Sequence, residues 1–224
     1  MPAAISSMPG YSFSAAELCR LSMMGLGDSV LLKICEVGNP ALRKTARALS
    51  VEEIRSEAIQ ALIGQMRDTM RDAPGVGLAA PQIGKSLQIA VIEDKAEYHK
   101  GLTEAQLLER QRVPVDFHVI VNPQIELLSP ADVLIFEGCL SVPRLMAAVA
   151  RSRLVRVTCL DERAEPRVIE AEGWYARILQ HEIDHLQGCL YTDVMRSETL
   201  TTVDNYQRYG PRGAASGAVT TRWA

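Results

Sequence analysis

The sequence lacks several features that would assign it to a membrane, a nucleic-acid-binding or a disulfide-stabilised class. Among its 224 residues, no apolar run approaches the roughly eighteen residues that a helix needs to span a bilayer. The formal net charge is only −3, which argues against a surface that follows a phosphate backbone. The five cysteines are odd in number and widely spaced, and no cationic start leads into an apolar signal core. We therefore expect no membrane or direct nucleic-acid partner, and a reducing compartment.

Histidine is also scarce, yet two of the four histidines lie four residues apart in the segment 180–185, Gln-His-Glu-Ile-Asp-His. In a helix, residues four apart share a face, so His181 and His185 would present two imidazoles side by side, with Glu182 next to them. A run without helix breakers precedes this segment, and Gly188 follows it where a left-handed cap belongs. His-Glu-x-x-His on a helix is typical of a transition-metal site whose carboxylate accepts a proton from water. The alternative is a surface helix with two solvated histidines.

The rest of the chain predicts one globular domain that begins near residue 30, since 47% of the residues are apolar and 23% are charged. Apolar periodicity, capping residues and turn residues place the elements. The expected helices are residues 41–46, 50–73, 103–112 and 174–187. The expected strands are residues 31–35, 87–93, 117–121, 125–128, 133–136, 154–160 and 167–171, with a turn at Asn122-Pro123. This order predicts an α+β fold, with mostly antiparallel or mixed short sheets packed around the C-terminal helix and a further helix near the N-terminus.

A glycine-rich segment, residues 75–84, reads Gly-Val-Gly-Leu-Ala-Ala-Pro-Gln-Ile-Gly. Its glycines and Ala80 match the dinucleotide fingerprint, but the segment follows an expected helix and runs into Pro81, whereas the fingerprint follows a strand and opens a helix. The glycines more readily let another backbone approach, and Gln82 offers an amide donor there. We interpret the segment as the wall of a cleft.

Two histidines leave a catalytic metal short of a ligand. Asp193 and Glu198 follow the helix, but no histidine does. Upstream, residues 137–143 read Glu-Gly-Cys-Leu-Ser-Val-Pro, and Cys139 could supply a thiolate. Taken alone, this cysteine is better explained as a buried, inert thiol, because free cysteine packs as a small hydrophobe.

In this order, the segments 75–84, 137–143 and 180–185 resemble the three signature motifs of the peptide deformylases. The resemblance covers about residues 30–205. The insertion after Asp94 and the ending at residues 201–205 are similar to the subgroup that includes organellar deformylases. This implies a catalytic domain at 28–205, an N-terminal extension of unknown role at 1–27, and a tail at 206–224.

The resemblance implies that Cys139, His181 and His185 hold a metal, natively Fe²⁺, with Zn²⁺ or Ni²⁺ able to occupy the site. It assigns Glu182 as catalytic base and acid, and Gln82 and the backbone N–H of Leu140 as donors to the oxyanion. The implied reaction removes the formyl group from the N-terminal formylmethionine of new polypeptides and releases formate.

The expected pocket combines helix spacing with the family pattern. Trp174, Arg177 and Ile178 precede His181 by seven, four and three residues, so they should share its face and line a pocket for methionine. The alternative is that Trp174 and Ile178 are ordinary core. The resemblance adds further substrate-binding residues, with the peptide extended along the first two: Val76, Gly77, Ile135, Glu137 and Gly138.

The resemblance also implies a pair of charged residues that supports the metal site. At one nearby position this chain departs from the family pattern. Asp184 would be a costly carboxylate near the metal unless it were paired, and the expected partner is Arg151. The alternative is two independently solvated charges. Many deformylases carry an arginine at the position of Met146, where this chain has Arg144 nearby instead.

Two other functions remain in view: a zinc peptidase of the His-Glu-x-x-His type, which gives no reason for Cys139, and a non-catalytic binder of formylated N-termini. The implied partner is an N-formylmethionyl polypeptide. Transient docking on a ribosome and a homodimer are left open. The implied location is cytoplasmic for a bacterial chain, with an organellar location also open.

Overall fold

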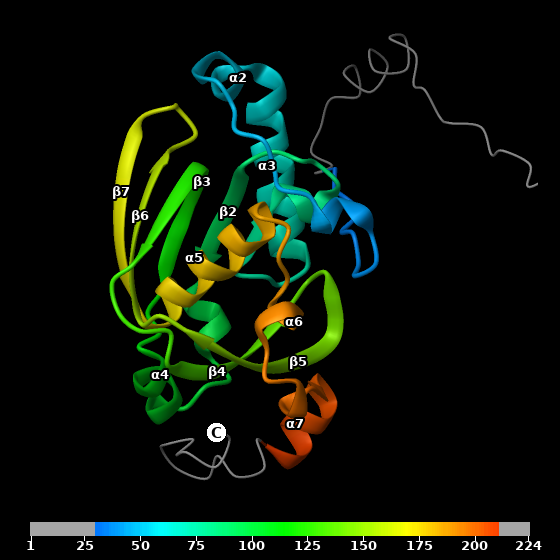
Figure 1. Ribbon diagram of the computed structural model, residues 1–224, viewed down its shortest axis with the longest axis vertical. Helices are drawn as coiled ribbons and strands as arrows, with labels where there is room; N and C mark the ends of the chain where they lie inside the picture. The colour runs from blue at the N-terminus through cyan, green and yellow to red at the C-terminus, as the bar shows by residue number, and fades with distance from the viewer. Residues whose placement is uncertain (1–29, 211–224) are drawn as a thin grey trace, which may run out of the picture.

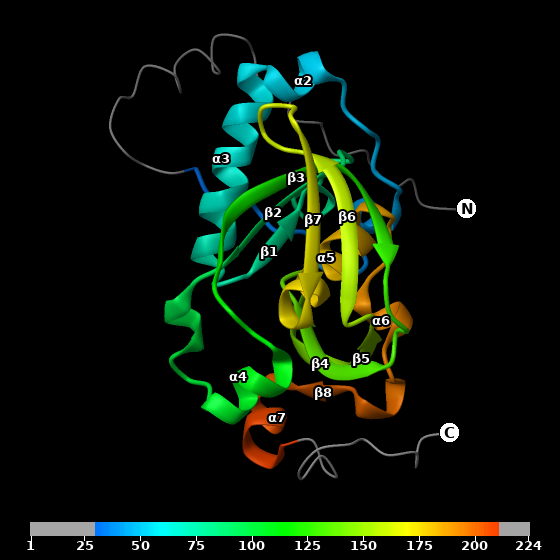
Figure 2. The same cartoon turned by 90° about the vertical axis from the view of Figure 1, so that its left-hand side faces the viewer.

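The computed structural model describes residues 30–210, so the expected extension 1–27 and residues 211–224 of the expected tail lie outside the described residues. The described part is α+β, as predicted, with antiparallel sheets around helix α5 (Figures 1 and 2). The helices are η1 Pro40–Arg43, α2 Val51–Arg55, α3 Glu57–Asp72, η2 Ala80–Ile83, η3 Ala96–His99, α4 Glu104–Arg110, α5 Gly173–Leu186, α6 Tyr191–Val194, η4 Ser197–Thr199 and α7 Val203–Tyr209. The strands are β1 Gly77–Ala79, β2 Ile89–Asp94, β3 Val115–Leu127, β4 Val133–Cys139, β5 Val142–Arg151, β6 Leu154–Leu160, β7 Pro166–Glu172 and β8 Thr201–Thr202.

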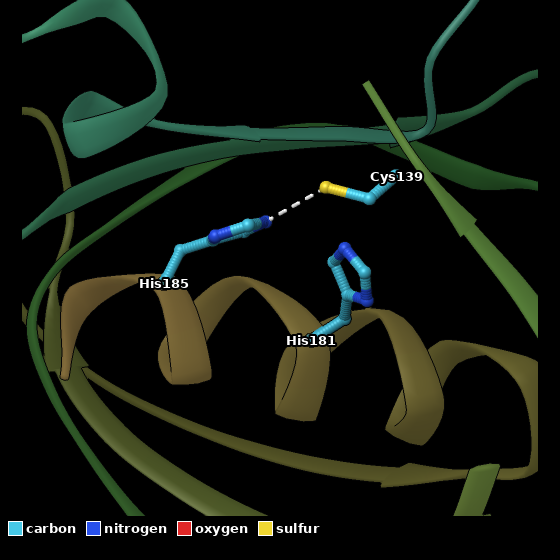
Figure 3. Close-up of side chains that lie close together, drawn as sticks. All are labelled: Cys139, His181 and His185. Atoms are coloured by element: carbon cyan, nitrogen blue, oxygen red, sulfur yellow. Dashed lines mark hydrogen bonds between the residues drawn. The ribbon is translucent and has the colours of Figure 1, made fainter. Parts of the chain in front are cut away.

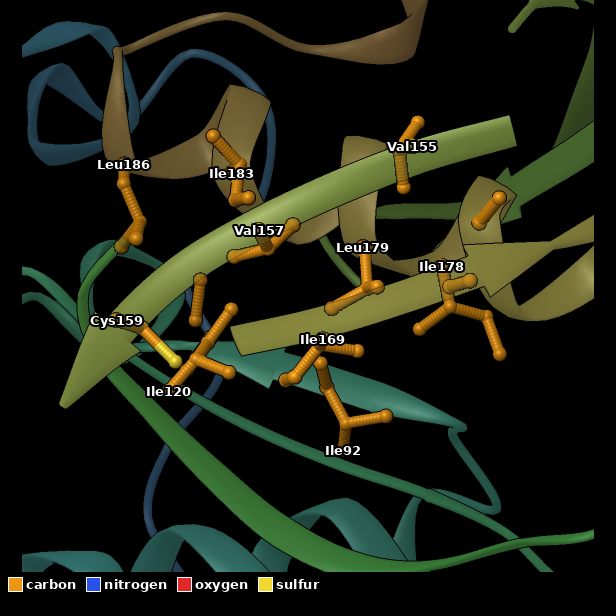
Figure 4. Close-up of a cluster of buried hydrophobic side chains, with 14 of the residues drawn as sticks. Ile92, Ile120, Val155, Val157, Cys159, Ile169, Ile178, Leu179, Ile183 and Leu186 are labelled. Carbon is orange, nitrogen blue, oxygen red and sulfur yellow. The ribbon is translucent and has the colours of Figure 1, made fainter. Parts of the chain in front are cut away.

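The larger sheet has the order β1-β2-β3-β6-β7, with every neighbouring pair antiparallel. At β2 both faces of the sheet are covered, which explains why every residue of this strand is buried rather than every second one. Ile89 and Val91 pack in the core that contains the buried face of α3, whereas Ala90 and Ile92 point the other way, into the core that contains α5. Figure 4 shows the α5 core, with Leu179 and Ile183 among its side chains. The sheet therefore fixes the position of α5.

The hairpin β4-β5 interrupts this sheet in sequence, between β3 and β6, and forms a second sheet with β8. Figure 1 shows α5 running between the larger sheet and this hairpin. Cys139 is the last residue of β4, so the hairpin brings the cysteine segment to the helix that carries the two histidines.

The first long helix is not continuous, contrary to the prediction. The capping box of Ser50 and Glu53 is present, but α2 ends at Arg55, and Ser56 takes an extended conformation. The Ser56 hydroxyl accepts a hydrogen bond from the backbone of Ile59, so this residue starts α3 as a second N-cap. Serine favours such caps over helix interiors, a local preference that the apolar periodicity concealed.

The predicted turn at Asn122-Pro123 is also wrong, because β3 continues through it to Leu127. The pairing of β3 with β6 shifts register between Val121 and Gln124, so the strand absorbs the dipeptide as a bulge. Asn122 has φ +50, which asparagine tolerates, and its side chain exchanges hydrogen bonds with the backbone of Leu49. The two strands expected at 117–121 and 125–128 are therefore one.

Two further boundaries differ from the prediction. Residues 31–35 form no strand; they run as a single segment without a ladder partner in the described part of the chain. The expected domain boundary at residue 205 lies inside α7, which continues to Tyr209. None of the helices within residues 30–210 has the length and apolar character required to cross a bilayer.

His118 joins β3 to the start of α5. Its Nδ1 lies 2.9 Å from the carbonyl oxygen of Asp116, which can only accept, so Nδ1 carries the hydrogen. The Nε2 atom then accepts from the hydroxyl of Tyr175, also at 2.9 Å. Burial lowers the pKa of His118, and the neutral ring suits both bonds.

We expect this buried, neutral histidine to make folding stability depend on pH. The unfolded chain takes up a proton near pH 6.5, whereas the folded chain resists it, so the free energy of unfolding should fall as the pH drops below about 6.5. Chemical unfolding between pH 5 and pH 8 should show the stability advantage of the wild type over His118→Gln shrinking with falling pH. An advantage that is the same at all pH values would contradict the assignment.

Candidate metal centre and cleft

Cys139, His181 and His185 lie together at the junction of β4 and α5. One ligand atom from each residue lies within 4.8 Å of the other two. Figure 3 shows both imidazoles rising from α5 toward the cysteine, and His185 Nε2 lies 3.2 Å from Cys139 Sγ. Helix spacing alone places the histidines side by side, and the strand end supplies the sulfur.

Glu137 orients the first of these histidines. His181 Nδ1 donates to Glu137 Oε2 at 3.0 Å, which leaves Nε2 available as a ligand atom. The carboxylate is 4% exposed and also accepts hydrogen bonds from Arg151 and Arg177. Burial opposes ionisation, but the hydrogen bonds from His181 and Arg151 outweigh it and hold the pKa of Glu137 well below its usual range. Glu137, which was expected to bind substrate, lines the cleft, and its carboxylate contacts His181, Arg151 and Arg177.

Arg151 links this carboxylate to the expected partner. Its Nη1 donates to Asp184 Oδ2 at 2.5 Å, while Nε and Nη2 form a bidentate pair with Glu137 at 2.9 and 3.0 Å. Burial tends to lower the pKa of Arg151, but the hydrogen bonds and charges of Glu137 and Asp184 raise it. The contact between Asp184 and Arg151 is thus one side of a larger network that ties α5 to β4 and β5.

Glu182 packs directly on β1. A Cβ atom added at Gly77 would lie 2.2 Å from Glu182 Oε1, so glycine is required at that position for the carboxylate to occupy its place. Burial raises the pKa of Glu182 to about 7, with His181 acting in the opposite direction. Within residues 30–210, Glu182 Oε2 is buried without a hydrogen-bond partner. A carboxyl group in this state is suited to exchanging a proton with water.

Gln82 is held by its own loop beside the cysteine. Its Oε1 accepts from the backbone of Ala79 at 2.8 Å, which turns Nε2 toward Cys139 Sγ at 3.6 Å and Ser141 Oγ at 3.3 Å. Residues 35–37 hydrogen-bond to both the segment that contains Gln82 and the segment that contains Ser141. The Cys35 N–H donates to the carbonyl of Gln82 at 2.7 Å. The N–H of Val37 donates to the carbonyl of Ser141, also at 2.7 Å.

A cleft of about 370 Å³ opens beside the cluster, with Cys139 and His181 in its wall. Ile178 belongs to both the cleft wall and the core, so the two interpretations of this residue are compatible. Most of the other residues expected at the site also line the cleft: Val76, Gly77, Gln82, Glu137, Gly138, Leu140, Trp174, Arg177 and Glu182.

Among the expected substrate-binding residues Ile135 is the exception, because it lines a second cavity of about 390 Å³ between α4, β4 and the start of α5. Arg177 lines both cavities and donates to Glu137 and to the carbonyl of Val133, each at 2.6 Å. Its buried guanidinium therefore borders both spaces. Burial lowers the pKa of Arg177, yet a guanidinium stays charged at neutral pH.

Other contributors to the site were not found from the sequence. Arg112, from the insertion, lines the cleft. Arg144, which was named from the sequence, also lines it, whereas Met146 pairs with Gly138 in the hairpin. The ring of Tyr191 stacks on His181 with centroids 6.4 Å apart. The partner of His181 could have been anticipated, because a ligand histidine needs an acceptor for its second nitrogen. The other contacts depend on tertiary packing.

The donor set suits a transition metal. A thiolate and imidazoles are ligands that zinc, iron and nickel accept, and the hydrogen-bonded Nδ1 of His181 is the expected outer support. A buried carboxyl group and an amide donor lie in the same cleft. The converging ligand atoms, the buried carboxyl group and the amide donor are the parts that a metal-dependent hydrolase requires.

The chain belongs to the polypeptide deformylase family, whose model matches residues 31–200. Peptide deformylase 1A, chloroplastic/mitochondrial, of Arabidopsis thaliana is 46% identical over 203 residues, which cover 89% of this chain and 76% of that protein. Peptide deformylase 1A, chloroplastic, of Solanum lycopersicum is 44% identical over 197 residues, which cover 87% of this chain and 71% of that protein. A solved structure of a class I type b peptide deformylase from Acinetobacter baumannii, bound to Met-Ala-Ser, has a TM-score of 0.66 at 31% identity and covers 75% of this chain and 100% of that chain.

Proposed function

We propose that the chain removes the formyl group from the N-terminal formylmethionine of new polypeptides and releases formate. The observation that carries this proposal is the placement of Glu182 and Gln82 in one cleft with the cluster of Cys139, His181 and His185. Membership of the deformylase family supports it. The proposed compartment is one where formylated chains are made, namely the bacterial cytoplasm or an organelle.

The cluster would hold the metal, with Fe²⁺ proposed as the native ion and Zn²⁺ or Ni²⁺ as substitutes. When bound, the metal would supply a Lewis acid that acidifies water and polarises the formyl carbonyl. Cys139 and the two histidines fit this role because their ligand atoms already converge. The network of Glu137 and Arg151 would keep His181 in its ligating orientation.

The protein side chains would then move the proton and stabilise the charge. Glu182 would take a proton from the attacking water and return it to the leaving amine. The amide of Gln82, already oriented by Ala79, and the backbone N–H of Leu140 would donate to the developing oxyanion. A formamide carbonyl is small enough to reach donors placed this deep in the cleft.

The substrate would lie extended along β1, which is one of the two edge strands of the larger sheet. Main-chain pairing at Val76 and Gly77 would hold the peptide without reading its later side chains. The methionine side chain would then enter the part of the cleft formed by Trp174 and Ile178. A passing encounter with the ribosome would be enough to supply such substrates.

Formate release from formyl-Met-Ala-Ser tests the proposal against its two alternatives. A deformylase produces formate and Met-Ala-Ser in equal amounts. A peptidase of the zinc type cleaves an internal bond and yields no formate, and a non-catalytic binder retains the formyl peptide unchanged. Either of these last two results, with the metal-loaded protein, would refute the proposal.

A further inference from the structure

The insertion between β2 and β3 packs against the first turn of α5. Figures 1 and 2 both place its helix α4 near the β4-β5 hairpin, below the larger sheet. A Cβ atom added at Gly173 would lie 2.5 Å from Gln111 Cβ and 2.7 Å from the carbonyl oxygen of Arg110. Gly173 also has φ +59, so glycine is required here for two reasons. The end of α4 therefore rests on the residue that precedes Trp174.

Two arginines from this insertion lie over the indole ring. The guanidinium carbon of Arg112 is 5.1 Å from the ring centroid of Trp174, and that of Arg110 is 5.2 Å from it. Guanidinium groups stack favourably on aromatic faces, and tryptophan gives the strongest such contact. Within the described residues, Trp174 Nε1 is buried without a hydrogen-bond partner. Hydrogen bonding therefore does not fix the indole, which is held by packing against the α5 core and by the two guanidinium groups.

Arg112 is itself held by the end of β2. Its Nε and Nη2 donate to the two carboxylate oxygens of Asp94, each at 2.7 Å. Asp94 is fully buried and pairs with Val115 across the base of the insertion. A bidentate pair of this kind fixes the plane of a guanidinium as well as its position. The orientation of Arg112 is thus set by the sheet.

We propose that Asp94, Arg112 and Arg110 form a clamp that fixes Trp174 as a wall of the cleft, so that the insertion determines side-chain selectivity. Trp174 and Arg112 both line the cleft, and Asp94 neutralises the charge of Arg112. The wall is therefore a rigid apolar plane, which suits a long unbranched side chain such as methionine. Arg112 is a positioning residue in this scheme. The inference rests on the proposed function.

Arg112→Lys is the sharpest test, because it keeps the charge and removes the planar fork. With formyl-Met-Ala-Ser, KM should rise about fivefold to tenfold while kcat stays within about twofold, because stacking contributes to binding rather than to proton transfer. The ratio of kcat/KM between formyl-Met-Ala-Ser and formyl-Ala-Ala-Ser should fall, approaching the ratio for Trp174→Ala. Arg110→Gln, which leaves the Asp94 pair intact, should shift the ratio in the same direction by less.

Tryptophan emission supplies a readout that does not depend on turnover. Trp223 is the other tryptophan of the chain and lies outside the described residues, so Trp223→Phe leaves Trp174 as the sole emitter. In that background, Arg112→Lys should change the emission of Trp174, and Met-Ala-Ser should perturb it less than in the parent. Arg163→Lys, an exchange at an exposed arginine, is the matched control and should change neither emission nor selectivity.

The outcomes separate the clamp from the proposed function. An active parent whose selectivity and emission are unchanged by both Arg112→Lys and Arg110→Gln overturns the clamp alone. A parent that releases no formate refutes the proposed function, and the clamp is then judged on emission, where an unchanged spectrum in Arg112→Lys overturns it. If Arg112→Lys fails to fold, Arg110→Gln decides: a lowered selectivity ratio supports the clamp and an unchanged one overturns it.

Discussion

Glu182→Gln is expected to retain a full equivalent of metal while formate release falls by about two to four orders of magnitude. The amide preserves the size of the side chain against Gly77, where there is no space for rearrangement, but it can neither accept a proton from water nor return one. Elemental analysis and formate release, measured on the same preparation, check both parts. Loss of metal in this variant would show that Glu182 is a ligand rather than the base.

Cys139→Ala should differ from Glu182→Gln in the fate of the metal. It removes one of three converging ligand atoms, so both the metal and the activity should be lost. Cys189→Ala is the matched control, because this half-buried thiol lies outside the cluster. Full metal occupancy in Cys139→Ala would remove the thiolate from the site, and metal loss in the control would show that the assay reports general damage.

Arg151→Ala is expected to lower the free energy of unfolding by about 3–5 kcal/mol and to release metal more readily. The change leaves Glu137, which is 4% exposed, without its bidentate partner, and it frees Asp184 from the hairpin. Glu137, the acceptor of His181, would then be held by Arg177 alone. Denaturant unfolding and metal retention against a chelator measure the two effects separately.

Arg156→Ala is the control for this experiment. Arg156 also contacts two carboxylates, those of Glu126 and Glu170, but on the exposed face of the sheet, where ion pairs contribute little. Its unfolding midpoint and metal retention should match the wild type. If Arg151→Ala behaves like Arg156→Ala, the buried network does not support the metal site.

Local signals predicted the parts of the structure that depend on local chemistry. The glycine after α5 and the capping boxes at Ser50 and Thr103 mark element ends as expected, because each uses contacts within a few residues. Helix periodicity places His181 and His185 side by side. The convergence of Cys139 with them required the family resemblance, because a hairpin from a different part of the chain delivers it.

The sequence did not predict features that arise from tertiary pairing. Asn122 read as a turn because asparagine and proline usually end strands, whereas its side-chain contacts with Leu49 let β3 continue. Ile135 was assigned to the cleft by the family resemblance, whereas it lines the second cavity, which Arg177 also borders. The role of Arg112 depends on a salt bridge with Asp94 across an insertion of unpredictable path.

Metal titration of formate release tests the central claim most directly. The purified chain is stripped with a chelator, loaded stepwise with Fe²⁺ under anaerobic conditions, and assayed with formyl-Met-Ala-Ser at each step. The site formed by Cys139, His181 and His185 predicts no formate without metal and a linear rise that ends at one equivalent per chain. Undiminished formate release by the metal-free protein, or none at full loading, would contradict the account.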